Sequence, residues 1–104
     1  MIPMKIQGKL VYRNMTDIGH RTVLAESVRP SAVAYDPVEQ RIYWSDVALN
    51  QVFRQFLNGT MREVYMEDSI GTVDGLAIDW KNRIMFFSNV LPLFNQKSKG
   101  IVLI

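Results

Sequence analysis

The sequence contains no cysteine, and His20 is its single histidine among 104 residues. Without cysteine the chain forms no disulfide and offers no thiolate as a nucleophile or metal ligand. A histidine-containing zinc site or a hydrolytic triad needs partner groups, and the sequence around His20 does not supply such a set. We therefore expect His20 to be an ordinary turn residue, and we predict no catalytic residue, metal site or cofactor.

Clustered positive charge and long apolar runs are also missing. The formal net charge is only +2 and the arginines are scattered singly, so the composition does not indicate a nucleic-acid partner. No apolar run approaches the ~18 residues of a spanning helix, and the N-terminus lacks the apolar core of a secretory signal. As written, the chain is expected neither to enter a membrane nor to anchor in one. No helical period is sustained either, so we predict an all-β fold.

What the sequence does contain is an internal repeat. Residues 40–46 read Gln-Arg-Ile-Tyr-Trp-Ser-Asp, and a looser copy, Asn-Arg-Ile-Met-Phe-Phe-Ser-Asn, ends 43 residues after Asp46. The same offset aligns residues 31–36 with residues 74–79. A fixed period in the forties, carried by short strand-like runs with aromatics, is typical of the blades of a β-propeller.

This period divides the chain into parts of blades. We expect an irregular N-terminus over residues 1–8, the last two strands of a preceding blade over 9–27, and one complete four-stranded blade over 28–67. The first two strands of the next blade are expected over 68–90. A divergent tail follows over 91–104, in which only residues 100–104 fit an apolar strand or the scar of a truncation. Within the complete blade, Asn58-Gly59 predicts a tight hairpin turn.

Three motifs resemble the class B repeats of the LDL receptor, which form six-bladed propellers in cell-surface receptors. Residues 43–46, Tyr-Trp-Ser-Asp, resemble the family's Tyr-Trp-Thr-Asp (YWTD) signature. Residues 74–80 and 57–60 are similar to its Asp-Gly-Leu-Ala-Val-Asp-Trp strand and Leu-Asp-Gly-Ser/Thr hairpin. The resemblance covers about residues 10–89 and implies a partial YWTD-type propeller, one complete blade flanked by two half blades. It assigns a structural role in the repeat to Tyr43, Trp44, Ser45, Asp46, Asp74, Gly75 and Asp79.

The resemblance also implies a function. LDL-receptor-related proteins, including endocytic receptors and Wnt co-receptors, bind protein ligands outside the cell and are not enzymes in these modules. The implied partners are therefore a protein ligand and the remaining blades or EGF-like modules of a longer parent. In such receptors the loop after the second strand lies on the ligand-facing end, which makes Val47, Ala48, Leu49 and Asn50 the candidate ligand-binding residues; the alternative is a solvated connector.

Two other interpretations of the function stay open. One is a propeller hydrolase of the lactonase or strictosidine-synthase-like kind, for which Asp74 is the one candidate near the channel; the other is a non-functional truncated product. The repeat spacing of Asp36, Asp46, Asp74 and Asp79 favours hydrogen bonding at strand ends over catalysis or metal binding.

Asn14-Met-Thr and Asn58-Gly-Thr fit the N-glycosylation pattern, so Asn14 and Asn58 are candidate acceptors in a secreted chain. The pair Asn58-Gly59 is equally explained by a hairpin turn alone.

The chain is too short to close the ring of a six-bladed propeller by itself. A six-bladed ring at this period needs about 260 residues. Partial blades leave strand edges and aromatic faces open to water. We therefore predict that the isolated chain is oligomeric, poorly soluble or marginally folded.

Overall fold

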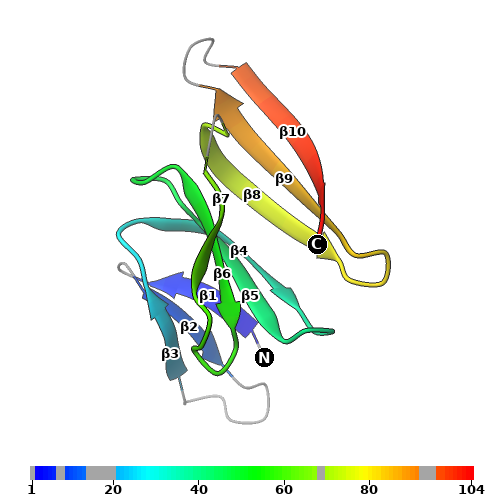
Figure 1. Ribbon diagram of the computed structural model, residues 1–104. Helices are drawn as coiled ribbons and strands as arrows, with labels where there is room; N and C mark the ends of the chain where they lie inside the picture. The colour runs from blue at the N-terminus through cyan, green and yellow to red at the C-terminus, as the bar shows by residue number, and fades with distance from the viewer. Residues whose placement is uncertain (1, 7–8, 14–20, 68–69, 92–95) are drawn as a thin grey trace.

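Short runs rich in β-branched and aromatic residues form strands throughout the part of the chain that the structure describes. This computed structural model describes the backbone of residues 2–6, 9–13, 21–67, 70–91 and 96–104, and the side chains from residue 25 onward within those ranges (Figure 1). These residues contain no helix. The strands are β1 (Ile2–Ile6), β2 (Lys9–Arg13), β3 (Arg21–Glu26), β4 (Pro30–Asp36), β5 (Arg41–Asp46), β6 (Gln51–Phe56), β7 (Glu63–Met66), β8 (Thr72–Asp79), β9 (Ile84–Leu91) and β10 (Gln96–Leu103).

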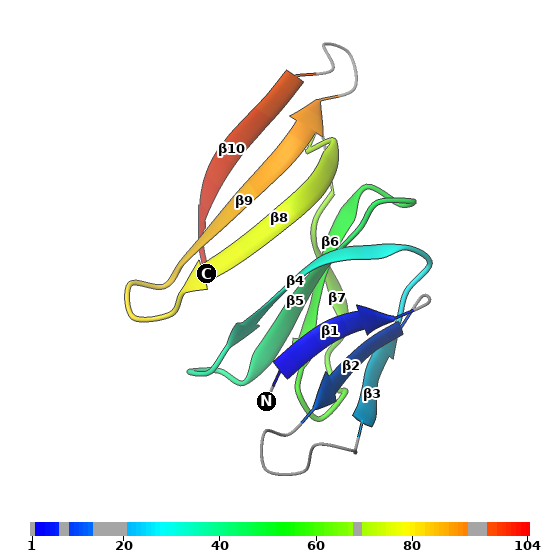
Figure 2. The same cartoon turned by 180° about the vertical axis from the view of Figure 1, so that it is seen from behind.

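The strands form three antiparallel sheets, with the orders β1-β2-β3, β4-β5-β6-β7 and β8-β9-β10. The three sheets meet along their first strands: β4 contacts β1 on one side and β8 on the other (Figures 1 and 2). Each sheet is a propeller blade, and the four-stranded sheet β4–β7 is called the complete blade below. The predicted all-β fold and partial propeller are confirmed.

The two ends of the chain differ from the prediction. Residues 2–6 form β1, whereas an irregular segment was predicted over residues 1–8. Apolar residues alternate at positions 2, 4 and 6, which is the period of a strand, and Pro3 is compatible with it because β1 is an edge strand. Within the divergent tail predicted over 91–104, β10 begins at Gln96 and pairs with β9 along its whole length. Each flanking sheet therefore has a third strand.

β5 is buried on both of its faces because a neighbouring sheet packs on each side of the complete blade. On the side of the β1–β3 sheet, Ile42 and Trp44 form a core cluster with Ala25 and Phe53. The rings of Trp44 and Phe53 stack with their centroids 5.5 Å apart. This cluster joins the complete blade to the preceding sheet.

The other face of β5 packs toward the β8–β10 sheet. The ring of Tyr43 meets Tyr65 edge-on at 5.3 Å, and the Tyr65 hydroxyl donates to the carbonyl oxygen of Leu103 at 3.2 Å. Arg54 lies over the Tyr65 ring at 4.5 Å. Aromatic side chains thus fill the wedge between blades on both sides of one strand.

The connection between β6 and β7 is wider than the tight turn that Asn58-Gly59 predicts. Gly59 has a φ of +89°, but Asn58 stays outside the left-handed region. Instead, the Asn58 side-chain oxygen accepts hydrogen bonds from the N–H and the hydroxyl of Thr60, at 3.0 and 2.6 Å. The predicted two-residue turn is wrong because the side chain of Asn58 closes its own turn, and the left-handed residues of this connection are Gly59 and Met61, with a φ of +58°, rather than Asn58 and Gly59.

Candidate functional site

The turn between β5 and β6 is anchored by the carboxylate of Asp46, the last residue of β5. Its Oδ1 accepts hydrogen bonds from the backbone N–H groups of Ala48 and Leu49, at 2.9 and 3.1 Å. Its Oδ2 accepts from the Ser27 hydroxyl at 2.5 Å and from the N–H of Arg29 at 3.1 Å. One buried carboxylate therefore ties the β5–β6 turn to the connection between β3 and β4.

The same network includes the tryptophan of the repeat motif. The Trp44 Nε1–H donates to the Ser27 hydroxyl at 3.2 Å. Burial alone would raise the pKa of Asp46, but the hydrogen bonds from Ser27 and three backbone N–H groups outweigh it and hold the pKa below its ordinary value. The carboxylate is therefore charged at neutral pH, when it accepts most strongly.

These two connections present apolar side chains to solvent at one end of the complete blade. Leu49 is 48% exposed and Val28 is 69% exposed. Ala48 is exposed as well, and Val47 is half-buried with its N–H bonded to the Arg29 carbonyl oxygen at 3.0 Å. We call Val28, Arg29 and residues 47–50 the end surface.

Asn50 closes the end surface toward the next blade. Its φ of +53° lies in the left-handed region, which asparagine tolerates better than most residues. Its side-chain oxygen accepts a hydrogen bond from the hydroxyl of Thr72, the first residue of β8, at 3.2 Å. All four residues predicted as a ligand-binding loop thus lie together in one anchored turn.

The four repeated aspartates do not converge. Asp36 lies at the opposite end of the complete blade, buried, and accepts two hydrogen bonds from the Arg83 guanidinium at 2.7 and 2.6 Å. Burial would raise the pKa of Asp36, but Arg83 and the N–H of Val38 hold it below its ordinary value. Asp79 accepts from Asn82 within its own turn at 2.8 Å.

Asp74 lies on the β8–β10 sheet, where its carboxylate accepts from the Ser88 hydroxyl at 2.7 Å. Across the described ranges, no group of three or more His, Cys, Asp or Glu side chains is placed to hold a metal ion. The ion pair of Asp36 with Arg83 was not predicted from the sequence, since the two residues belong to different blades and no local pattern links them.

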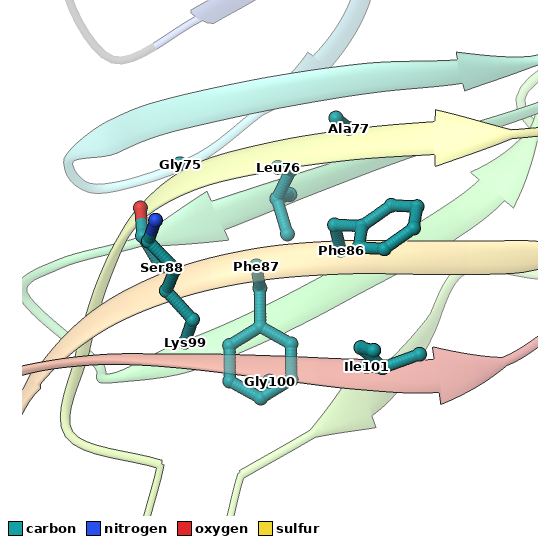
Figure 3. A pocket seen from close by; sticks show the side chains of 9 residues that line it. All are labelled: Gly75, Leu76, Ala77, Phe86, Phe87, Ser88, Lys99, Gly100 and Ile101. Atoms are coloured by element: carbon teal, nitrogen blue, oxygen red, sulfur yellow. The ribbon is translucent and has the colours of Figure 1, made fainter.

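The β8–β10 sheet carries a second feature, an open apolar hollow of about 520 Å³ (Figure 3). Phe86 and Ile101, which are 44% and 67% exposed, line it from β9 and β10. The prediction missed it because it placed no strand at residues 96–99. Its lining residues come from all three strands: Gly75, Leu76, Ala77, Phe86, Phe87, Ser88, Lys99, Gly100 and Ile101.

Two residues singled out in the sequence, Asn14 and His20, lie outside the described residues. The other glycosylation candidate, Asn58, is exposed in the connection between β6 and β7. Within the described part of the chain there is no helix of the length and apolarity that crossing a membrane requires.

Comparisons with known proteins agree with the repeat. Residues 40–80 match the family described as low-density lipoprotein receptor repeat class B. Low-density lipoprotein receptor-related protein 5 of Mus musculus and of Homo sapiens is 36% identical over 53 residues, which are 51% of this chain and 3% of the relative. Human low-density lipoprotein receptor-related protein 4 is 41% identical over 49 residues, 47% of this chain and 3% of that protein.

A solved structure supports the fold. A chain of the "Crystal structure of Nidogen/Laminin Complex" superposes with a TM-score of 0.70 at 17% identity, over 89% of this chain and 41% of that one. The chain therefore spans under half of this structural neighbour and about 3% of the curated relatives it matches. The family resemblance that the three sequence motifs indicated is confirmed.

Proposed function

We propose that this chain, whose residues 40–80 match the low-density lipoprotein receptor class B repeat, is part of an extracellular propeller that binds a protein ligand and is not an enzyme. The observation that carries the proposal is the Asp46 network, which fixes an exposed apolar surface at one end of the complete blade. The parent is a receptor of the LDL-receptor-related kind, either endocytic or a Wnt co-receptor. Its further blades or EGF-like modules are the chain's other partners.

The end surface has the properties of a binding site on a rigid scaffold. Its turn is held by hydrogen bonds before a ligand arrives, so binding does not have to order a flexible loop. Leu49 and Val28 offer apolar contact area, and the Arg29 guanidinium beside them has no ion pair within the described residues. Apolar anchors with a free cation at the rim suit a protein ligand better than a small polar substrate.

The hydrolase alternative receives no such support, because the aspartates that it would use lie at separate places in the structure. Asp74 is bonded to Ser88 on an open sheet face, and Asp36 is neutralised by Arg83.

The cellular part of the proposal is tested by the size of the native product. Cells and medium are blotted with an antibody to this segment, with and without glycosidase. We expect a band far larger than this chain that shifts on deglycosylation, since Asn58 is exposed and Asn14 begins a second acceptor pattern. A single unshifted band of the size of this chain in the cytosol would contradict the receptor assignment.

The binding part is tested on the end surface itself. Peptides are selected from a random phage-displayed library on the immobilised chain, and their affinities are then measured on variants. We expect Leu49→Ser and Val28→Ser to weaken the selected peptides at least about tenfold, the effect of losing one buried apolar anchor. Val38→Ser is the matched control, since Val38 is also exposed but lies in the turn at the opposite end of the complete blade. Peptides that bind all these variants equally would remove the end surface from the proposal.

A further inference from the structure

The β8–β10 sheet has one face that no described residue of the chain covers. The cross-strand register places two rows on this face, Gly75–Ser88–Lys99 and Ala77–Phe86–Ile101. The opposite face packs on the complete blade, and there Met85 is fully buried. We call the uncovered side the open face; its exposed apolar residues include Leu103, at 77%.

We propose that in the isolated chain a second copy covers the open face, the side on which a further blade of a longer propeller would pack. The twofold axis is parallel to the strands, so that β10 of each copy lies over β8 of the other. In the two rows β8 contributes only small residues, Gly75 and Ala77, and the hollow opens beside them (Figure 3). β10 contributes the long residues Lys99 and Ile101 to the same rows. This axis sets Ile101 over Ala77 and Lys99 over Gly75, so that each long side chain meets a small one.

The charges on the open face favour the same arrangement. Asp74 keeps its carboxylate on this face, because it accepts the Ser88 hydroxyl at 2.7 Å. Lys99 has no ion pair within the described residues. In the dimer it lies over Gly75 of the second copy, where its ammonium meets the carboxylate of the neighbouring Asp74. A twofold axis perpendicular to the strands would instead set Lys99 over Ile101, which desolvates a charge without a partner.

The size of the face sets the strength of the dimer. Its three strands have eight residues each, so the face measures about 26 by 14 Å. Two such faces bury on the order of 1,000 Å², at the lower end of specific interfaces. The Phe86 rings of the two copies lie near the axis, where aromatic contact adds most to a small interface. An interface of this size is typical of weak, transient complexes.

Sedimentation velocity of the purified chain tests the proposal between about 1 and 100 µM, a range in which small interfaces dissociate. We expect a monomer that converts to a dimer as concentration rises. Ile101→Lys should weaken the dimer at least about tenfold, because it places a charge in the apolar row. Val38→Lys makes the same charge change at an exposed turn elsewhere and should leave the dimer unchanged. Circular dichroism verifies that each variant keeps its strands, as expected for exposed positions.

A charge exchange tests the pairing itself. Lys99→Asp and Asp74→Lys should each weaken the dimer, and the double variant should restore it. A monomer throughout the range would leave the face to another occupant, such as a further blade, and would overturn the proposal. A dimer that survives Ile101→Lys, or a double variant that restores nothing, would overturn it too. Leu49→Ser should dimerise normally, so failure here is separate from failure of the end surface.

Discussion

The complete blade and the β8–β10 blade share one repeat, but they bury it differently. In β5 every residue from Ile42 to Asp46 is buried, whereas in β9 buried residues alternate with half-buried and exposed ones. β5 has a neighbouring sheet on both faces and β9 on only one. The same pattern of residues therefore gives a two-sided core in one blade and a one-sided core in the other. Burial here is decided by the neighbours of the sheet and not by the strand alone.

The two blades also differ in the residue that anchors the end of the motif strand. Asp46 accepts four hydrogen bonds, but at the equivalent position Asn89 is buried with its Nδ2 donating to the Ile70 carbonyl oxygen at 2.6 Å. The Asn89 Oδ1 has no hydrogen-bond partner among the residues that the structure describes. An amide has one accepting oxygen where a carboxylate has two, so it cannot accept N–H and O–H donors on both of its polar atoms as Asp46 does.

Contacts between blades show the third difference. Asp36 reaches Arg83 of the next blade, and this bidentate pair, in which the carboxylate is buried and the guanidinium is partly exposed, fastens the two sheets together. Asp79 occupies the same place in the repeat but bonds to Asn82 in its own turn. The first aspartate is an interblade contact, whereas the second is a turn residue.

The largest effect should come from the aromatic residues of the two motif strands. We expect Trp44→Ala to cost about 4 kcal/mol of unfolding free energy, because it removes a fully buried ring and its stacking on Phe53. The equivalent Phe87→Ala should cost about half as much, since Phe87 is only half-buried. Urea unfolding measures both losses of stability, followed by far-UV circular dichroism because this signal does not rely on tryptophan fluorescence. Equal losses would mean that β9 is covered as fully as β5.

Removing the carboxylate of the anchor should come next. Asp46→Asn keeps the shape but leaves an amide nitrogen facing two hydrogen-bond donors, and we expect a loss of about 2–3 kcal/mol. Ser27→Ala removes one of the four bonds and should cost about 1 kcal/mol. Both values come from urea unfolding, and hydrogen exchange at Ala48 and Leu49 should quicken in Asp46→Asn. Unchanged exchange at these two amides would show that the turn does not depend on the carboxylate.

A smaller effect is expected at the contacts between blades. Asp36→Asn should lower the free energy of unfolding by about 2 kcal/mol, since the amide loses the charge-assisted bonds to Arg83. Asp79→Asn makes the same change at the equivalent position and should leave the urea midpoint where it is. If both variants lost the same stability, Asp79 would have to contact a further blade or chain in solution.

These differences also mark how far the sequence alone could reach. The complete blade was predictable because the motif with Tyr43 and Trp44 recurs 43 residues later, which is the period of propeller blades. β1 was missed although Ile2, Met4 and Ile6 alternate, and the first half of β10 was missed because residues 96–99 include no apolar residue. The partners of Asp46 and Asp36 could not be predicted either. Ser27 and Arg83 reach them across 19 and 47 positions, and only the packing of the sheets brings such residues together.

The smallest effect should be the dependence of stability on pH. The folded state holds the pKa values of both Asp36 and Asp46 below their ordinary value, so these carboxylates stabilise the fold above the unfolded pKa, about 4. Their contribution is lost as the pH falls through the folded pKa values. We expect the free energy of unfolding to change little from pH 7 to about 5 and to decline below about 4. The decline should be shallower in Asp46→Asn and in Asp36→Asn than in the parent chain, whereas Asp79→Asn, with an exposed carboxylate, should follow the parent more closely. A parent curve that stays flat to pH 2, or variants as steep as the parent, would mean that the two buried carboxylates are not what distinguishes the complete blade.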